Sequence, residues 1–144
     1  MNRLYEFTIN PNDLSQAGIA SSFIKNILKK LNVNREIIRR VAIATYEAEI
    51  NVVIHSYGGK CNFIITDNSL NVTFIDYGPG IISIEEAMLE GTSTASKYAI
   101  ENGFGAGMGL PNMQKASDHF SITSSKEGTV ISMLFKLGGD LNDC

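Results

Sequence analysis

Four glycines occupy every second position between residues 103 and 109, late in the chain and directly before an apolar segment at 108–118 that can form a helix. Successive backbone N–H groups in such a run can surround an anion. A helix that begins there adds the positive end of its dipole, so a phosphate group is the natural occupant. The residues expected to contact that phosphate are Gly103, Gly105, Ala106, Gly107, Met108, Gly109 and Leu110.

Two common glycine motifs and a plain linker fit this run less well. A P-loop ends in Gly-Lys-Ser or Gly-Lys-Thr, and neither tripeptide follows Gly109. A Rossmann fingerprint follows the first strand of its domain and precedes a ribose-binding acid, whereas this run comes late. A flexible linker would not normally lead straight into an apolar helix. The aperiodic segment 91–109, rich in Gly, Ser and Thr, is therefore predicted to be a binding loop or lid.

Strand and helix patterns account for most of the remaining chain. Turn residues at 67–69 and 127–128 join strands in pairs without crossover helices, so the sheet is expected to be mixed and mainly antiparallel. With helices covering one face, the expected fold is a two-layer α/β sandwich. The predicted strands are 3–9, 60–67, 70–76, 119–126 and 129–137, and the predicted helices are 13–31, 35–57, 83–90 and 108–118.

The bulk composition narrows the class of protein. A chain of 144 residues without an internal linker predicts a single domain, 1–144, with 138–144 as a flexible tail. The net charge of −3 argues against binding to nucleic acid, whose phosphates require a basic surface. Cys61 and Cys144 are expected to be free thiols. Without a signal segment or a stretch of about 20 apolar residues, we expect a cytoplasmic protein with no membrane span.

A pair of polar residues interrupts the apolar helix predicted at 35–57. Glu47 and Asn51 are four residues apart and share one helical face. A carboxylate can accept a proton from a hydroxyl group, and an amide oxygen is a ligand suited to Mg²⁺. A solvated helix face would produce the same pattern. Glu49 falls on another face of this helix, where we expect it at the surface.

Two further short motifs lie at strand ends. Asp76, Gly78 and Gly80 end or follow the strand predicted at 70–76. Glycines there allow close approach to a flat ligand, and a carboxylate can accept hydrogens from the amino group of adenine. A plain Asp-Gly-Pro turn is the alternative. Thr129 opens the last strand, where it is either a hydroxyl that reaches a phosphate or an ordinary β-branched strand residue.

Together these motifs resemble the GHKL ATPase superfamily, which includes gyrase, mismatch-repair, chaperone and histidine-kinase ATPases. Four of its motifs occur in the family's order and cover nearly the whole chain. They are Glu-x-x-x-Asn at Glu47 and Asn51, Asp-x-Gly-x-Gly at Asp76, Gly78 and Gly80, Gly-x-Gly-x-Gly at Gly105, Gly107 and Gly109, and Gly-Thr at Gly128 and Thr129. The resemblance implies the GHKL (Bergerat) ATP-binding fold.

Within the superfamily, the chain resembles the anti-sigma-factor serine/threonine kinases and the stressosome switch kinases. Its small size, the helix segment 47–55 and the segment 107–120 carry this resemblance. Two departures from the family pattern concern partner contacts more than nucleotide binding. Residues 112–114 replace small and basic residues, and Glu49 adds an acid beside the first motif.

The resemblance also implies cofactors and a role for each motif. It implies that ATP binds with Mg²⁺, that Asp76 contacts adenine and that Asn51 binds the metal. It further implies that the 103–109 loop holds the phosphates and that Glu47 acts as the base. The implied reaction is phosphoryl transfer to a serine or threonine of a STAS-domain antagonist protein. Such a transfer depends mainly on positioning and charge neutralisation, which Mg²⁺ and loop amides can supply.

Several alternatives stay open on the sequence alone. An ATP-binding regulatory module without phosphoryl transfer is the second hypothesis, and Glu47 favours the kinase because a binder needs no base. A sigma factor or another regulator is a further candidate partner, and a homodimer is a candidate assembly. The catalytic half of a histidine kinase is disfavoured, because nothing before residue 35 predicts a dimerising helical hairpin with a phosphoacceptor histidine.

Overall fold

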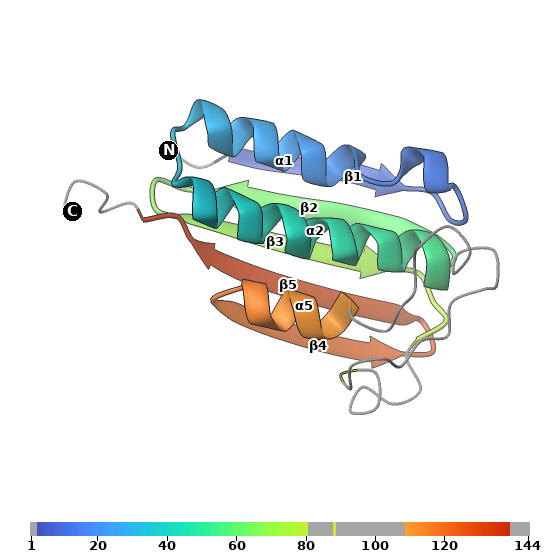
Figure 1. The fold of residues 1–144 in the computed structure, drawn as a ribbon. Coiled ribbons are helices and arrows are strands. Elements are labelled where there is room, and N and C mark those ends of the chain that lie inside the picture. Colours follow the sequence, from blue (N-terminus) through green and yellow to red (C-terminus); the bar gives the residue numbers. More distant parts are fainter. Residues whose placement is uncertain (1–2, 81–87, 89–108, 139–144) are drawn as a thin grey trace.

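The computed structural model describes residues 3–80, 88 and 109–138, which form a five-stranded sheet with helices on one face (Figure 1). The two-layer α/β sandwich expected from the sequence is confirmed. No helix in these ranges combines the length and apolar character needed to cross a membrane. The strands are β1 (Arg3–Ile9), β2 (Gly59–Ile65), β3 (Ser69–Asp76), β4 (His119–Ser125) and β5 (Gly128–Lys136). The helices are η1 (Leu14–Gln16, a 3-10 turn), α1 (Ile19–Lys30), α2 (Arg35–His55) and α5 (Gly109–Ala116).

The strand order across the sheet is β1-β2-β3-β5-β4, and every neighbouring pair is antiparallel. The helices α1 and α2 form a hairpin between β1 and β2, which lets these two strands pair in opposite directions. In the chain, α5 lies between β3 and β4, and these two strands run the same way. The expected mixed sheet is wrong in this respect, because β5 inserts between the two strands that would have formed a parallel pair.

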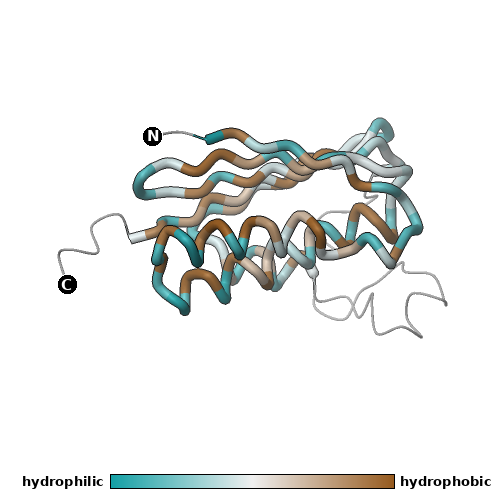
Figure 2. Tube along the Cα trace, turned by 90° about the horizontal axis from the view of Figure 1, so that it is seen from above, coloured by the Kyte–Doolittle hydropathy of each residue, from teal (hydrophilic) through white to brown (hydrophobic). Residues whose placement is uncertain are grey.

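Alternation along the central strands places apolar side chains on the helix-covered face of the sheet. Phe63 of β2, Phe74 of β3 and Phe135 of β5 are fully buried there, whereas Ile64 on the opposite face stays exposed. Figure 2 shows the resulting two layers from above. Cys61 belongs to the same core as a free thiol, and burial raises the pKa of that thiol. The core therefore lies between the sheet and α1, α2 and α5.

The first helical segment is more broken than the sequence predicted. The stretch expected to be one helix at 13–31 consists of η1, a break and then α1. Gly18 lies at this break with a φ of +98°, a left-handed conformation that glycine adopts without the clash of a Cβ atom. A side chain at Gly18 would also approach the ring of Tyr46 to 3.3 Å. The break lets α1 begin beside α2.

Glu49 of α2 caps the N-terminus of α1. Its Oε2 accepts the backbone N–H of Ala20 and its Oε1 accepts that of Ser21, both at 3.1 Å. The expectation that Glu49 lies at the surface is wrong, since only 2% of the residue is exposed. A buried carboxylate is stable here because the first N–H groups of a helix need acceptors and the helix dipole favours a negative charge. Glu49 thereby fixes α1 against α2.

Candidate functional site

Glu47 and Asn51 of α2 meet the first residue of α5. A Cβ atom built on Gly109 would lie 3.1 Å from Oε2 of Glu47, 3.4 Å from Oδ1 of Asn51 and 3.5 Å from its Nδ2. Both side chains are half-buried at this contact, which favours the site interpretation over a solvated helix face. The N-terminus of α5 therefore lies directly beside the carboxylate and the amide.

The environment of Glu47 suits a proton acceptor. Burial raises the pKa of this carboxyl group above its ordinary value, because removal from water disfavours the charged form. Among the described residues, none hydrogen bonds to the carboxylate. A carboxylate with a raised pKa binds a proton more strongly than an exposed one, and a general base works best when its pKa approaches the working pH.

Asp76 is held in a fixed orientation at the end of β3. Its Oδ1 accepts the backbone N–H of Gly78 at 3.0 Å and the backbone N–H of Thr129, on β5, at 2.9 Å. Within the described ranges, its Oδ2 accepts no hydrogen bond. The residue is only partly buried. The carboxylate therefore offers one oriented acceptor to a ligand beside it.

The glycines after Asp76 allow the chain to pack against the turn between β4 and β5. A Cβ atom on Gly80 would lie 1.9 Å from the carbonyl oxygen of Ser125, and one on Gly78 would lie 2.9 Å from that of Lys126. Neither position has room for a side chain, since real Cβ atoms do not approach backbone oxygens so closely. Gly78 and Gly80 thus let the chain after Asp76 pack directly against the backbone of the β4–β5 turn, which keeps Asp76 beside β5.

Thr129 is buried beside Asp76, with only 4% of its surface exposed. Its Oγ1 lies 2.8 Å from Oγ of Ser124, the residue opposite it in the β4–β5 hairpin. Motif reasoning missed Ser124, and the pairing register of that hairpin is the signal that could have found it. The hydrogen bond from its backbone N–H to Asp76 places Thr129 at the Asp76 end of the site.

His55 lies between the α2–α5 contact and Asp76. It is the last residue of α2 and lies one turn after Asn51, half-buried. Burial lowers the pKa of His55, and the negative charge of Asp76 opposes that shift. Glu47, Asn51 and His55 thus lie along one side of α2. Glu47 is beside α5, and His55 is near enough to Asp76 for the charge of that carboxylate to affect its pKa.

Part of the predicted site lies outside the described residues, together with nearly all of the helix predicted at 83–90 and of the segment predicted as a lid at 91–109. The site residues concerned are Gly103, Gly105, Ala106, Gly107 and Met108. Gly109 and Leu110, the last of the predicted phosphate-binding residues, begin α5. The side chain of Leu110 belongs to the hydrophobic core, which leaves its backbone as the group available to a ligand.

The residues at the α2–α5 contact fit a magnesium ion held mainly by its substrate. Nowhere in the described part of the chain do three or more His, Cys, Asp or Glu residues gather as a metal site. Mg²⁺ commonly keeps several waters and takes only one or two protein oxygens beside the phosphates of its nucleotide. Oδ1 of Asn51, close to the start of α5, is an oxygen of the required kind.

Comparison with known proteins identifies relatives over most of the chain. It is 30% identical over 129 residues to the anti-sigma F factor of Thermoanaerobacter sp. (strain X514), covering 85% of this chain and 87% of that protein. It is also 30% identical over 117 residues to the serine/threonine-protein kinase RsbT of Bacillus subtilis (strain 168), covering 76% of this chain and 80% of the kinase. The resemblance carried by the motifs is thereby confirmed.

A solved structure supports the same fold. The RsbU and RsbW domains of Rv1364c from Mycobacterium tuberculosis match 94% of this chain with a TM-score of 0.65 and 15% identity. The match spans 32% of that longer chain, and at 15% identity it supports the fold alone. The sequence profile of the histidine kinase-like ATPase domain matches residues 10–135. The chain therefore belongs to the histidine kinase-like ATPase domain family.

Proposed function

We propose that this protein is an ATP-dependent serine/threonine protein kinase that phosphorylates a STAS-domain antagonist protein in a partner-switching pathway. Relatives named anti-sigma F factor and serine/threonine-protein kinase RsbT support this assignment. The observation that carries it is the contact of Glu47 and Asn51 with the N-terminus of α5 at Gly109. A protein that only binds ATP needs no general base at this place.

The reacting end of ATP is assigned to the α2–α5 contact. The N-terminus of α5 offers backbone N–H groups and the positive end of a helix dipole to the phosphates, together with residues 103–108. Asn51 would hold Mg²⁺, which when bound neutralises charge on the phosphates. Glu47 would accept the proton of the substrate hydroxyl as its oxygen attacks the γ-phosphorus and ADP leaves.

The adenine end of ATP is assigned to Asp76. Gly78 and Thr129 hold one oxygen of this carboxylate through their backbone N–H groups. The other oxygen would accept a hydrogen from the exocyclic amino group of adenine, which is a donor. Gly80 completes this wall by its close approach to the β4–β5 turn.

The partner and the setting belong to the same proposal. We infer a single domain over 1–144, a cytoplasmic location and a STAS-domain protein as substrate, with a sigma factor or another regulator as a second kind of partner. A homodimer is the candidate assembly. Nucleic acid and membranes are not among the proposed partners, in keeping with the net charge of −3.

The test is phosphate transfer to purified STAS-domain proteins of the same genome. The full chain is incubated with Mg²⁺ and ATP labelled at the γ-phosphate, with each candidate in turn. We expect one candidate to acquire phosphoserine or phosphothreonine. If the protein binds Mg-ATP but phosphorylates none of them, the regulatory binding module replaces the kinase.

A further inference from the structure

We propose that Arg40 is a positioning residue for phosphoryl transfer, because it holds the C-terminal end of α5 and so fixes where its N-terminal end meets Glu47 and Asn51. The inference rests on the proposed kinase function. Nothing in the sequence motifs singles out Arg40, which touches neither Glu47 nor Asn51. Its role would be exerted entirely through α5.

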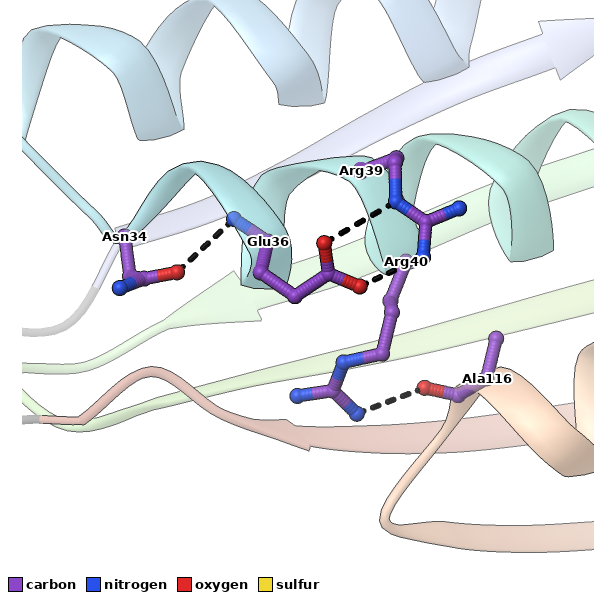
Figure 3. Close-up of polar contacts among 5 residues, drawn as sticks. All are labelled: Asn34, Glu36, Arg39, Arg40 and Ala116. Atoms are coloured by element: carbon purple, nitrogen blue, oxygen red, sulfur yellow. Dashed lines mark hydrogen bonds and ion pairs between the residues drawn. The ribbon is translucent and has the colours of Figure 1, made fainter.

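Arg40 reaches from α2 to the last residue of α5. Its Nη1 donates to the carbonyl oxygen of Ala116 at 3.0 Å, as Figure 3 shows. The last carbonyl groups of a helix have no partner within the helix, and a cation there also meets the negative end of the helix dipole. The contact therefore gives the carbonyl group of Ala116 a hydrogen-bond donor and places a positive charge at the negative end of the α5 dipole.

Asp118 gives the Arg40 side chain a second anchor. Its Oδ1 lies 4.0 Å from Nη1 of Arg40, and both side chains are partly buried. Asp118 is itself fixed on the sheet, because its Oδ2 accepts the backbone N–H of Lys136 and its own N–H donates to Leu134. Arg40 thus ties the end of α5 both to α2 and to β5.

The spacing along the two helices matches. Glu47 lies seven positions after Arg40 on α2, and Ala116 lies seven positions after Gly109 on α5. Each interval spans about 10 Å at 1.5 Å per residue. The two helices are therefore antiparallel over this length, with Arg40 at one end of α5 and Glu47 at the other.

The Arg40 contact adds a directional bond to the apolar contacts along α5 and to the Asp118 bonds that follow its last residue. α5 has only eight residues, too few to be stable as an isolated helix. Leu110, Pro111 and Met113 attach it to the core through apolar burial, which is not directional. The Arg40–Ala116 hydrogen bond is directional, so it can determine how far α5 extends toward Glu47.

The neighbouring arginine provides a matched control. Arg39 is the same residue type one position earlier, but it turns away from α5 and pairs with Glu36 on its own helix (Figure 3). Both members of that pair are well exposed. A change at Arg39 removes the same charge without touching α5.

The experiment compares Arg40→Gln, Arg40→Lys and Arg39→Gln in the full chain. Steady-state phosphate transfer gives kcat and KM, and calorimetry gives the affinity for Mg-ATP. Thermal unfolding gives the melting temperature of each variant, and the assay temperature is set well below all of them. A displacement of about 1 Å can cost about 10²-fold in rate, so we expect Arg40→Gln to lower kcat about 10- to 10²-fold. Arg40→Lys can still donate to Ala116 and should recover most of that loss, and Arg39→Gln should equal wild type.

Equal kcat values for Arg40→Gln and Arg39→Gln in the folded state would overturn the positioning role. If the wild type transfers no phosphate, the proposed kinase function fails, and the claim that Arg40 sets the position of the N-terminal end of α5 is then decided by two further readouts. These are the affinity for Mg-ATP and the rate of amide hydrogen exchange at the start of α5. The inference requires weaker binding and faster exchange in Arg40→Gln only, and it falls if all three variants match the wild type.

Discussion

Asp76 at the end of β3 accepts the backbone N–H of Thr129 at the start of β5, with 2.9 Å between Oδ1 and N. The two residues lie 53 positions apart in the chain. This bond and the one from Gly78 leave the second carboxylate oxygen as the acceptor for an incoming donor. A ligand bound beside this oxygen would have to present a hydrogen-bond donor, and the amino group of the proposed adenine is one.

Nucleotide choice follows from this arrangement. We expect ATP and ADP to bind with Mg²⁺ about 5- to 150-fold more tightly than GTP and GDP. An acceptor that the bound base covers without offering a donor costs about 1–3 kcal/mol. Guanine offers an acceptor oxygen where adenine has its amino group. Isothermal titration calorimetry with the four nucleotides measures the difference, and equal affinities would remove adenine from Asp76.

A matched variant tests the same contact from the protein side. In Asp76→Asn, the amide oxygen can still accept from Gly78 and Thr129, so the fold should persist. The amide nitrogen then presents a donor where the carboxylate presented an acceptor. We expect the preference for ATP over GTP to shrink or reverse. An unchanged preference would show that the base is read elsewhere.

Glu47 and Asn51 should fail in different ways when replaced. Asn51→Ala removes the oxygen assigned to Mg²⁺ and should weaken ATP binding in the presence of Mg²⁺ far more than in its absence. Glu47→Gln keeps the shape and removes the base, so nucleotide affinity should stay near wild type. Phosphate transfer should fall by about 10²- to 10⁴-fold, the usual contribution of general base catalysis. A Glu47→Gln protein that transfers phosphate at the wild-type rate would disprove the base assignment.

The raised pKa of Glu47 predicts a pH-dependent cost to stability. In the folded protein this carboxyl group keeps its proton to a higher pH than in the unfolded chain, where its pKa has the ordinary value of 4.5. Its contribution is therefore favourable below that value and is lost as pH rises through the folded pKa. At neutral pH, Glu47→Gln should unfold at a higher temperature than wild type, and the difference should vanish at pH 4. The exposed Glu127→Gln serves as the control, and an advantage that persists at pH 4 would rule out titration of Glu47 as its cause.

Glu49 should matter for stability and hardly at all for the chemistry. In Glu49→Gln, the amide NH₂ group faces one of the two N–H groups of Ala20 and Ser21, so one buried hydrogen bond is lost. Leaving a buried donor unpaired costs about 1–3 kcal/mol. We expect that loss in urea unfolding, with little change in Mg-ATP affinity once the protein is folded. A variant as stable as wild type would show that the cap contributes nothing.

Local sequence patterns predicted the parts of the site that each lie within one element. The four-residue spacing of Glu47 and Asn51 defines a common helical face in any α-helix, and Asp76 directly ends an alternating strand. Both placements follow from the geometry of a single helix or strand. The helix start at Gly109 follows equally from the glycines and the apolar residues after it.

Contacts between elements were out of reach of the same patterns. Glu49 looks like a surface acid because its partners, the first N–H groups of α1, carry no sequence signal of their own. Arg40 is one of two consecutive arginines, and only the packing of α5 distinguishes it from Arg39. The position of β5 between β3 and β4 depends on which strand edge the last hairpin meets, and alternation along a strand does not record that choice.

The insertion of β5 between β3 and β4 would also couple nucleotide binding to folding, if adenine binds at Asp76 as proposed. Because Asp76 and Thr129 come together only when the last strand has joined the middle of the sheet, a partly folded or truncated chain has no complete adenine wall. Contacts this distant in sequence form late, since the loop between them must first be closed. Under the proposed adenine assignment, nucleotide would bind only the finished sheet, and by mass action bound ATP would oppose the separation of β5 from its neighbours. A lower ATP concentration would then lower the free energy of unfolding of the protein.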